Sequence, residues 1–179
     1  ISETYENIKL TESYIKSLHN SLMKYSAKDQ WHKGNYKTHN NAVEASYPDG
    51  TRQIIFQTTE AGFATEDAIR QLLYWYNSET EVHPLIKIAS FVYDFLSVHP
   101  FQDGNGRLSR LISTLLLLKN GYNWIQYVSF EHEIENRKSE YYQVLRSCQK
   151  QRPNEDVTVW LKFFLSCLSN IQSQLTRKL

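Results

Sequence analysis

The chain lacks any long apolar run. Its longest uninterrupted aliphatic run, Leu115–Leu118, is far short of the roughly 20 residues that span a bilayer, so we expect no membrane span. The sequence also has no basic segment followed by an apolar one at its start, and it begins at Ile1 rather than at a methionine. We therefore expect a trimmed piece of a longer chain, with its native N-terminus missing.

An excess of charge of one sign is missing too. Twenty Lys and Arg stand against nineteen Asp and Glu, which gives a formal net charge of +1 without any long block of like charge. This balance excludes a positive potential over the whole protein surface that would attract nucleic acids or anionic membranes. We therefore expect neither as a partner, and we expect any anion site to be local. Cysteine is scarce as well: Cys148 and Cys167 lack CxxC spacing and fall on apolar helical positions, which predicts reduced core thiols in a cytoplasmic protein.

The composition that remains is that of a globular protein. The chain has 12 Tyr, 8 Phe and 4 Trp, and 41% of its residues are hydrophobic. This content excludes disorder, and a mass of 21.1 kDa leaves no room for a second domain of normal size. We expect a single domain over residues 1–179, in which residues 1–10 are a possible remnant of an upstream helix.

The periodicity of apolar residues predicts a mainly α-helical fold with one β-hairpin. Apolar and polar residues alternate on either side of a Pro48-Asp49-Gly50 turn signal, which predicts strands over about 43–47 and 53–58. Helical spacing predicts helices from Thr11 to about Tyr25, from Thr65 to about Asn77, from Pro84 to about Val98, from about Gly106 to Lys119, and over about 134–148 and 157–175.

The loop between the two most apolar predicted helices, His99 to Arg110, carries residues suited to phosphate chemistry. Gly104 and Gly106 let backbone N–H groups approach a ligand where the next helix begins, which is a cradle for anions. Arg107 and Arg110 lie three residues apart in the first turns of that helix, so both guanidinium groups can fork onto phosphate oxygens. Two arginines imply more than one phosphate.

Two further side chains of the loop complete this chemistry. A carboxylate beside bound phosphates is tolerated with a cation between them, so Asp103 points to Mg²⁺. His99 is the side chain able to take a proton near neutral pH. Taken singly, the histidine could cap a helix, Asp103-Gly104 could be a turn and the arginines could be solvated. The phosphate-site interpretation is favoured because all of these features fall in one break between two buried helices.

The same segment resembles the signature of the Fic family, HPF-x-[DE]-GNGR-x-x-R, and all nine fixed positions are matched between His99 and Arg110. The flanking helices, the upstream hairpin and the Glu140-Tyr141-Tyr142 segment extend the resemblance over most of the chain. It implies a helical bundle with a β-hairpin flap over the active-site loop. It also implies transfer of AMP from Mg-ATP to a Ser, Thr or Tyr hydroxyl of a target protein, with self-modification.

The resemblance assigns a role to each residue of the motif. His99 would deprotonate the attacking hydroxyl, and Asp103 would hold Mg²⁺. Gly104, Asn105 and Gly106 would present donors to the phosphates. The remaining assignments are the β-phosphate to Arg107 and the γ-phosphate to Arg110.

Two sites outside the motif follow from the same resemblance. The segment Gln53-Ile54-Ile55-Phe56 is similar to the flap that clamps the target by adding a strand, although an ordinary hairpin that covers the core would read the same way. Tyr141 and Tyr142, with Asn136 upstream, occupy the segment that forms the adenine pocket. Tyr141 could equally be a core residue of its helix, so Tyr142 is the better candidate for the base.

Several alternatives stay open. Family members with Lys in place of the second glycine act as kinases, which Gly106 argues against, while others use different nucleotide donors. A binding module without catalysis is a third possibility. Ser2–Asn7 fits the loose pattern [ST]-x-x-x-E-[GN] of an inhibitory helix through Glu6. An upstream segment or a separate antitoxin could inhibit instead, and the apolar C-terminal helices could support a homodimer.

Overall fold

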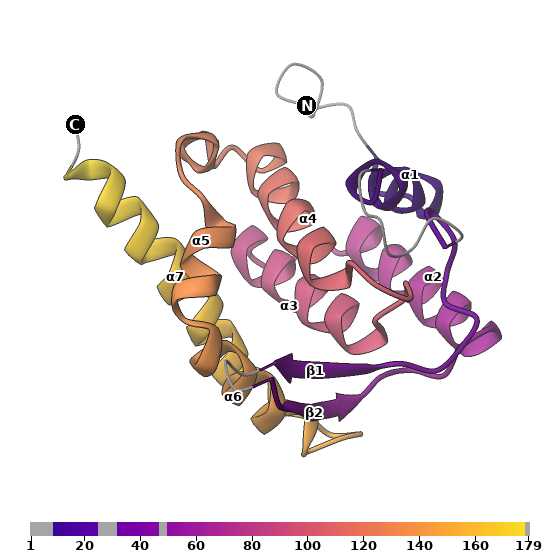
Figure 1. Ribbon diagram of the computed structural model, residues 1–179. Coiled ribbons are helices and arrows are strands. Elements are labelled where there is room, and N and C mark those ends of the chain that lie inside the picture. The colour runs from indigo at the N-terminus through magenta and orange to yellow at the C-terminus, as the bar shows by residue number, and fades with distance from the viewer. Residues whose placement is uncertain (1–8, 25–31, 47–49, 178–179) are drawn as a thin grey trace. The chain divides into compact units, whose positions relative to one another are not determined.

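A computed structural model of the chain describes residues 9–24, 32–46 and 50–177 (Figure 1). They fall into two compact units. The first, which we call the loop unit, lies within residues 8–81 and 94–109, and the second, the C-terminal unit, lies mainly within residues 82–93 and 110–179. Helices α3, Pro84–Val98, and α4, Asn105–Lys119, contribute residues to both units.

The loop unit begins with helix α1, Glu12–Leu22. Thr11 caps it as predicted, because its hydroxyl accepts a hydrogen bond from the amide of Tyr14 at 3.2 Å. The helix ends at Leu22, earlier than expected. Its buried face consists of Ile15 and His19, so a histidine takes a place that the apolar pattern gives to leucine.

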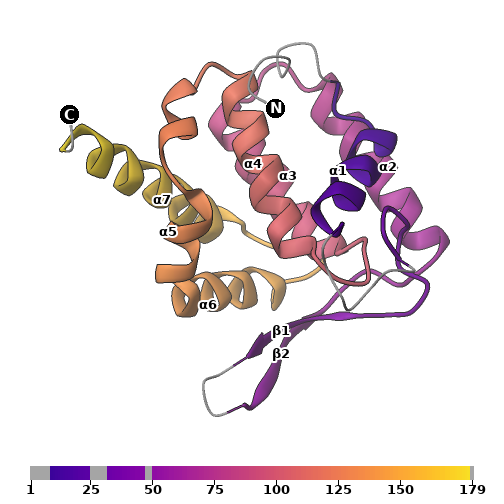
Figure 2. The ribbon, with the colours of Figure 1, turned by 45° about the horizontal axis from the view of Figure 1, so that its top comes forward.

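The predicted hairpin is confirmed as an antiparallel pair of strands, β1, Ala42–Ser46, and β2, Arg52–Gln57. It extends away from α1 and α2 within the loop unit (Figure 2). A bulge interrupts the pairing beside Val43, and the two successive residues Ile55 and Phe56 are both buried. Regular alternation would expose one of them, so the bulge changes the faces on which β2 presents its side chains. Of the predicted turn, only Gly50 lies among the described residues.

Helix α2, Phe63–Ser78, starts two residues before the predicted start at Thr65. Gly62 occupies the N-cap with φ of 84°, a left-handed conformation that turns the chain into the helix without a side-chain cap. Thr65 is buried inside the first turn, where its hydroxyl donates to the carbonyl of Glu60 at 2.5 Å. The apolar stripe of α2 is buried as predicted and comprises Ile69, Leu72, Leu73 and Tyr76.

Helix α3 is largely buried, as its near-continuous apolar sequence predicts. Only Asp94 of its last eight residues, 91–98, is exposed. Helix α4 ends at Lys119, and Gly121 follows it with φ of 85°, which matches the predicted glycine termination. The loop of residues 99–104 therefore joins two well-anchored helices.

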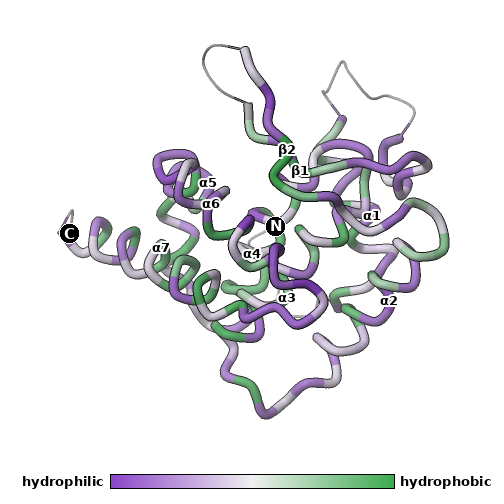
Figure 3. The backbone as a smooth tube through the Cα atoms, turned by 90° about the horizontal axis from the view of Figure 1, so that it is seen from below, coloured by the Kyte–Doolittle hydropathy of each residue, from purple (hydrophilic) through white to green (hydrophobic). Residues whose placement is uncertain are grey.

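In the C-terminal unit, a 3₁₀ helix η2, Asn123–Tyr127, precedes α5, Phe130–Asn136, α6, Lys138–Gln149, and α7, Thr158–Thr176. The stretch predicted as one helix over about 134–148 is thus divided at Arg137, whose φ of −111° leaves the helical region. Ser129 caps α5 by accepting from the amide of His132. Helix α7 is amphipathic, and hydrophobic and hydrophilic segments of its backbone tube alternate along its length (Figure 3).

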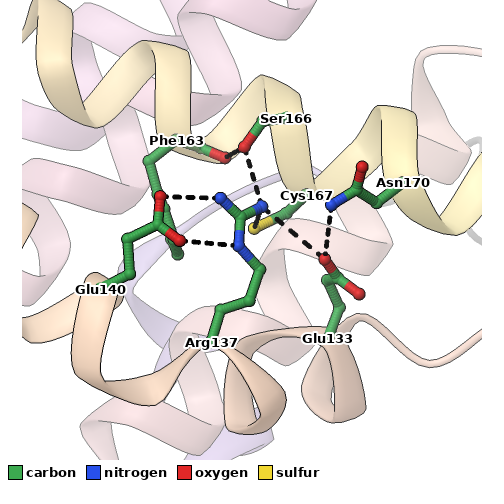
Figure 4. A network of polar contacts seen from close by, with 7 residues as sticks. All are labelled: Glu133, Arg137, Glu140, Phe163, Ser166, Cys167 and Asn170. Carbon is green, nitrogen blue, oxygen red and sulfur yellow. Dashed lines mark hydrogen bonds and ion pairs between the residues drawn. The ribbon is translucent and has the colours of Figure 1, made fainter.

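Arg137 fastens this junction to α7 (Figure 4). Its guanidinium donates to Glu140 and Ser166, both at 2.8 Å, and stacks over the ring of Phe163 at 4.7 Å. The buried carboxylate of Glu133 lies 3.7 Å away. Because so many partners converge on one cation, the break between α5 and α6 has a defined geometry.

Cys148 and Cys167 are free and buried, as predicted. Burial raises the pKa of Cys167 to about 12, which keeps this thiol protonated and unreactive. Among the helices of the described residues, none combines the length and the apolar character that crossing a membrane requires.

Candidate active site

His99 directly follows the last residue of α3 and has an unusual backbone conformation. Its φ is +53°, in the left-handed region that favours glycine, while its amide still bonds to the carbonyl of Phe95 at 2.9 Å. On the side chain, Nδ1 lies 3.2 Å from the carbonyl oxygen of Leu96. A carbonyl can only accept, so Nδ1 carries the hydrogen and Nε2 keeps a lone pair that can take a proton.

The surroundings of His99 keep it neutral. Loss of hydration and the positive charge of Lys37 lower the pKa of His99 to about 4, against the opposing effects of the Leu96 hydrogen bond and the Asp103 charge. The imidazole is therefore unprotonated at neutral pH. A group in this state can act as a general base.

The backbone around His99 is fixed by an unusually complete set of hydrogen bonds. Four consecutive carbonyl oxygens, those of residues 98–101, each accept a hydrogen bond from one short segment that precedes β1. Lys37 donates to Val98 and Pro100, and Asn41 to His99 and Phe101, over distances of 2.8–3.4 Å. This arrangement holds a strained residue in place, as strained functional residues require.

Asn105 closes the loop from its other end. Its side-chain amide accepts from the backbone N–H of Phe101 at 2.9 Å and donates to the carbonyl of the same residue at 2.7 Å. Asn105 is only 1% exposed, so its side chain serves the loop and its backbone N–H is the group left for a ligand. The ring of Phe101 is fully buried and stacks on His19 at 3.8 Å, which anchors the motif in the core.

Gly104 is needed here for a reason that the sequence does not reveal. Its φ is +80°, and a Cβ at this position would lie 2.9 Å from Sδ of Met23 and 3.5 Å from Nε2 of His19. His19 in turn donates from Nε2 to the carbonyl of Asp103 and accepts the amide of Gly34 at Nδ1, both at 3.0 Å. Helix α1 thus supports the loop by close contact.

The start of α4 offers donors to an anion. In a helix that begins at Asn105, the amides of Asn105, Gly106 and Arg107 have no acceptor one turn back within the helix. Arg107 is about half exposed, and its guanidinium lies 3.9 Å from the carboxylate of Asp103. These groups and His99 all belong to the loop unit, so the structure brings them together.

Asp103 is the one residue of this loop suited to a cation. Its carboxylate is 54% exposed and accepts from the amide of Gly104 at 2.6 Å. The described residues contain no cluster of three or more metal-ligating side chains. A single carboxylate nevertheless fits Mg²⁺, which usually keeps several waters and binds one or two carboxylates together with phosphate oxygens.

The second motif arginine, Arg110, belongs to the C-terminal unit and is engaged there by an acid. Its Nη2 donates to Oε1 of Glu131 at 2.7 Å, and its Nε contacts the other oxygen of the same carboxylate. Burial lowers the pKa of Arg110, but the hydrogen bond to Glu131 and the electrostatic effects of Tyr141, Glu131 and Tyr142 together outweigh it, so the pKa is raised. Glu131 therefore occupies the fork that the motif resemblance gives to the γ-phosphate.

The two tyrosines of the expected adenine pocket differ in burial. Tyr141 is 7% exposed and packs against Trp160 and Phe163 with ring centroids 5.9 and 6.1 Å apart, so it is a core residue. Burial raises its pKa. Tyr142 is only partly buried, and Asn136 is exposed, which leaves these two residues as the candidates for contact with a base.

The four residues of the expected flap divide in the same way. Ile55 and Phe56 are buried, whereas Gln53 is exposed and Ile54 keeps 52% of its surface exposed. The strand thus has one part that covers the core and one that can meet another chain. Glu6, the expected inhibitory residue, lies outside the described residues.

Three residues that support the loop were missed by sequence reasoning: His19, Lys37 and Asn41. His19 falls four residues after Ile15 on the apolar face of α1, and this spacing could have indicated a buried histidine. Lys37 and Asn41 lie in an irregular segment, whose sequence has no periodic pattern from which burial could be predicted.

Sequence similarity to known proteins covers more than half of this chain. A family model described as "Fic/DOC family" matches residues 9–117. The protein adenylyltransferase Fic of Drosophila virilis is 31% identical over 96 residues, which are 52% of this chain and 18% of that protein. Its Drosophila melanogaster counterpart is 32% identical over 95 residues, 52% of this chain and 17% of that protein. This chain therefore spans less than a fifth of the length of these relatives.

Solved structures extend the likeness to nearly the whole chain. A Fic family protein from Desulfovibrio desulfuricans has a TM-score of 0.79 and 27% identity, and the match covers 99% of this chain and 50% of that one. Fic-1 from C. elegans has a TM-score of 0.67 at 20% identity over 95% of this chain and 44% of that one, which shows the shared fold. The mainly helical fold with a small hairpin is thus the fold of these proteins.

Proposed function

Because the chain belongs to the Fic/DOC family, as the match over residues 9–117 establishes, we propose that this domain is a protein adenylyltransferase. It transfers AMP from ATP to a Ser, Thr or Tyr hydroxyl of a target protein and to its own hydroxyls. The observation that carries this proposal is the state of His99. A neutral imidazole with its Nε2 lone pair available precedes the amides that begin α4 by only a few residues.

The chemical step needs one base and one anion site. The target hydroxyl oxygen attacks the α-phosphorus of ATP, the bond to the bridging oxygen of the β-phosphate breaks, and pyrophosphate leaves. The hydroxyl proton passes to Nε2 of His99. Backbone amides at the start of α4 stabilise the negative charge that develops on the α-phosphoryl oxygens.

The remaining motif residues hold the nucleotide. Arg107 binds the β-phosphate, and Arg110 binds the γ-phosphate after exchanging its partner Glu131. Asp103 holds Mg²⁺, which supplies positive charge to the phosphates when it is bound. Tyr142, with Asn136, contacts the adenine, and Tyr141 supports them from the core.

The hairpin presents the target. A target segment that pairs with the edge of the hairpin through main-chain hydrogen bonds would be held without much reading of its sequence. Gln53 and Ile54 are the exposed residues for this contact, while Ile55 and Phe56 hold β2 against the core.

Two parallel incubations test the function. The domain is mixed with Mg²⁺ and a cell lysate and with ATP labelled at either the α- or the γ-phosphate. Beyond the label that the lysate acquires without the domain, we expect label on protein from the α-position alone and none with His99→Ala. His132→Ala, an exposed histidine on α5, is the matched control and should retain transfer. Label from the γ-position would indicate a kinase, and no label from either would contradict the proposal and favour another nucleotide donor or a binding module.

A further inference from the structure

The side chain of Lys37 is a buried cation with a role that the motif does not assign. It is 2% exposed, yet its ammonium donates three hydrogen bonds of 2.9 Å, to Oδ1 of Asn41, Oγ1 of Thr58 and the carbonyl of Val98. All three acceptors are neutral oxygens. Burial lowers the pKa of Lys37 to about 8. A lysine rarely occupies such a position unless the structure uses its three donors.

The three acceptors come from three different segments of the chain, which this amine joins. Val98 is the last residue of α3 and precedes His99, Asn41 immediately precedes β1, and Thr58 immediately follows β2. Thr58 also donates its hydroxyl to the carbonyl of Asn41 at 2.9 Å, which closes the base of the hairpin. The amine thus joins the end of the helix to both strands of the hairpin at their base.

The main chain of the same residues continues the connection. The amide of Lys37 donates to the carbonyl of Pro100 at 2.8 Å, and the side chain of Asn41 donates to the carbonyl of Phe101 at 2.8 Å. All of these residues belong to the loop unit. The conformation around His99 and the position of the hairpin base therefore depend on one set of hydrogen bonds.

We propose that Lys37 is a positioning residue that couples the loop of His99 to the base of the hairpin. This coupling keeps the general base, His99, in a fixed position relative to a target strand that pairs with the hairpin. This inference rests on the proposed function for its consequence, since the coupling matters when the hairpin holds a target. Its structural content is independent of that function. The charge of Lys37 also acts on His99, together with Asp103 from the loop and the carbonyl of Leu96.

Hydrogen exchange tests the coupling without any need for activity. In Lys37→Met, which keeps the length of the side chain and removes its donors, we expect the amides of β1 and β2 and those of Val98, His99 and Phe101 to exchange ~10-fold faster or more, with α7 unchanged. Thr58→Val, which keeps the lysine, should accelerate exchange in the hairpin alone. Lys150→Met removes an exposed lysine and should change neither segment. Faster exchange in only one of the two segments of Lys37→Met would overturn the proposal.

A second measurement distinguishes positioning from general destabilisation. Titration of the His99 imidazole by NMR, assigned with His99→Ala, should give a higher pKa in Lys37→Met than in the wild type, because a nearby positive charge is gone. Thr58→Val should leave that value unchanged. If Lys37→Met does not fold, Thr58→Val decides alone: unaltered exchange in the hairpin would refute the coupling. When the wild type transfers no label, only the proposed function fails, and both measurements still stand.

Discussion

The two ends of the motif are held in opposite ways. In the loop unit, the carbonyls of residues 98–101 all accept hydrogen bonds from Lys37 and Asn41. The side chain of Asn105 is bonded to the backbone of Phe101. In the C-terminal unit, Arg110 is bound to the carboxylate of Glu131, which a nucleotide would have to displace under the proposed function. The first arrangement leaves nothing to rearrange before the reaction, whereas the second requires an exchange of partners.

This difference indicates which unit controls the rate of the proposed transfer and which controls nucleotide affinity. Preorganised groups cost little reorganisation when charge develops, so they suit the chemical step. A group already paired with an acid binds a phosphate only at the expense of that pair, so it suits the control of affinity. Changes in the loop unit should therefore affect the rate of transfer, and changes around Arg110 should affect nucleotide affinity.

The largest effect is expected from removing the base. His99→Ala should lower the rate of AMP transfer by about 10²–10⁴-fold with little change in nucleotide affinity. Because the pKa of the wild-type residue is lowered to about 4, its neutral form persists in mild acid, and the acid limb of kcat/KM should lie well below pH 6.5. The pH profile of label transfer measures this limb, and a limb at or above pH 6.5 would contradict the environment described for His99.

The next largest effect is a loss of stability in the C-terminal unit. Arg137→Met removes the partner of the buried carboxylate of Glu133 and the hydrogen bonds to Glu140 and Ser166. Glu133 keeps its hydrogen bond from Asn170, so leaving its buried charge without the cation should lower the free energy of unfolding by about 2–3 kcal/mol. Urea denaturation measures the loss. Lys138→Met, which breaks an exposed ion pair with Glu135, is the control and should cost at most ~1 kcal/mol.

A pair of glycines sharpens the comparison between the units. Gly104 and Gly121 have nearly equal positive φ values, 80° and 85°, but a Cβ would lie 2.9 Å from Met23 at the first and have nothing within 4 Å at the second. Gly121→Ala should cost about 1–2 kcal/mol of stability through backbone strain. Gly104→Ala should cost a further ~1–2 kcal/mol through overpacking. Equal losses in urea denaturation would show that α1 yields to the new methyl group.

Much of this architecture could be predicted from the sequence, for identifiable reasons. The helices follow from apolar spacing that is strongest in α3, and the N-cap at Thr11 and the stop before Gly121 obey local rules. The motif from His99 to Arg110 located the loop because its residues are adjacent in the chain. Local patterns succeed where the determining contacts are themselves local.

What could not be predicted depends on contacts between distant segments. Lys37 reads as a solvated lysine in an irregular stretch, and only the fold shows that it reaches Val98. One error is local: Thr65 has the sequence features of an N-cap, but Gly62 occupies that position and the hydroxyl of Thr65 bonds to the carbonyl of Glu60. The bond between Arg110 and Glu131 joins residues of two helices, and no spacing rule predicts it.

The smallest expected effect tests whether the pair of Arg110 and Glu131 controls nucleotide affinity. Glu131→Gln keeps the shape of the side chain but removes the negative charge that competes for Arg110, so Mg-ATP should bind ~3–10-fold more tightly, about 1 kcal/mol. AMP, which has no β- or γ-phosphate, should bind both proteins equally. Isothermal titration measures both ligands, with Glu135→Gln as a control that leaves Arg110 paired. Unchanged affinity for Mg-ATP would mean that Arg110 binds phosphate without leaving Glu131, or does not bind it at all, and the C-terminal unit would then not control affinity.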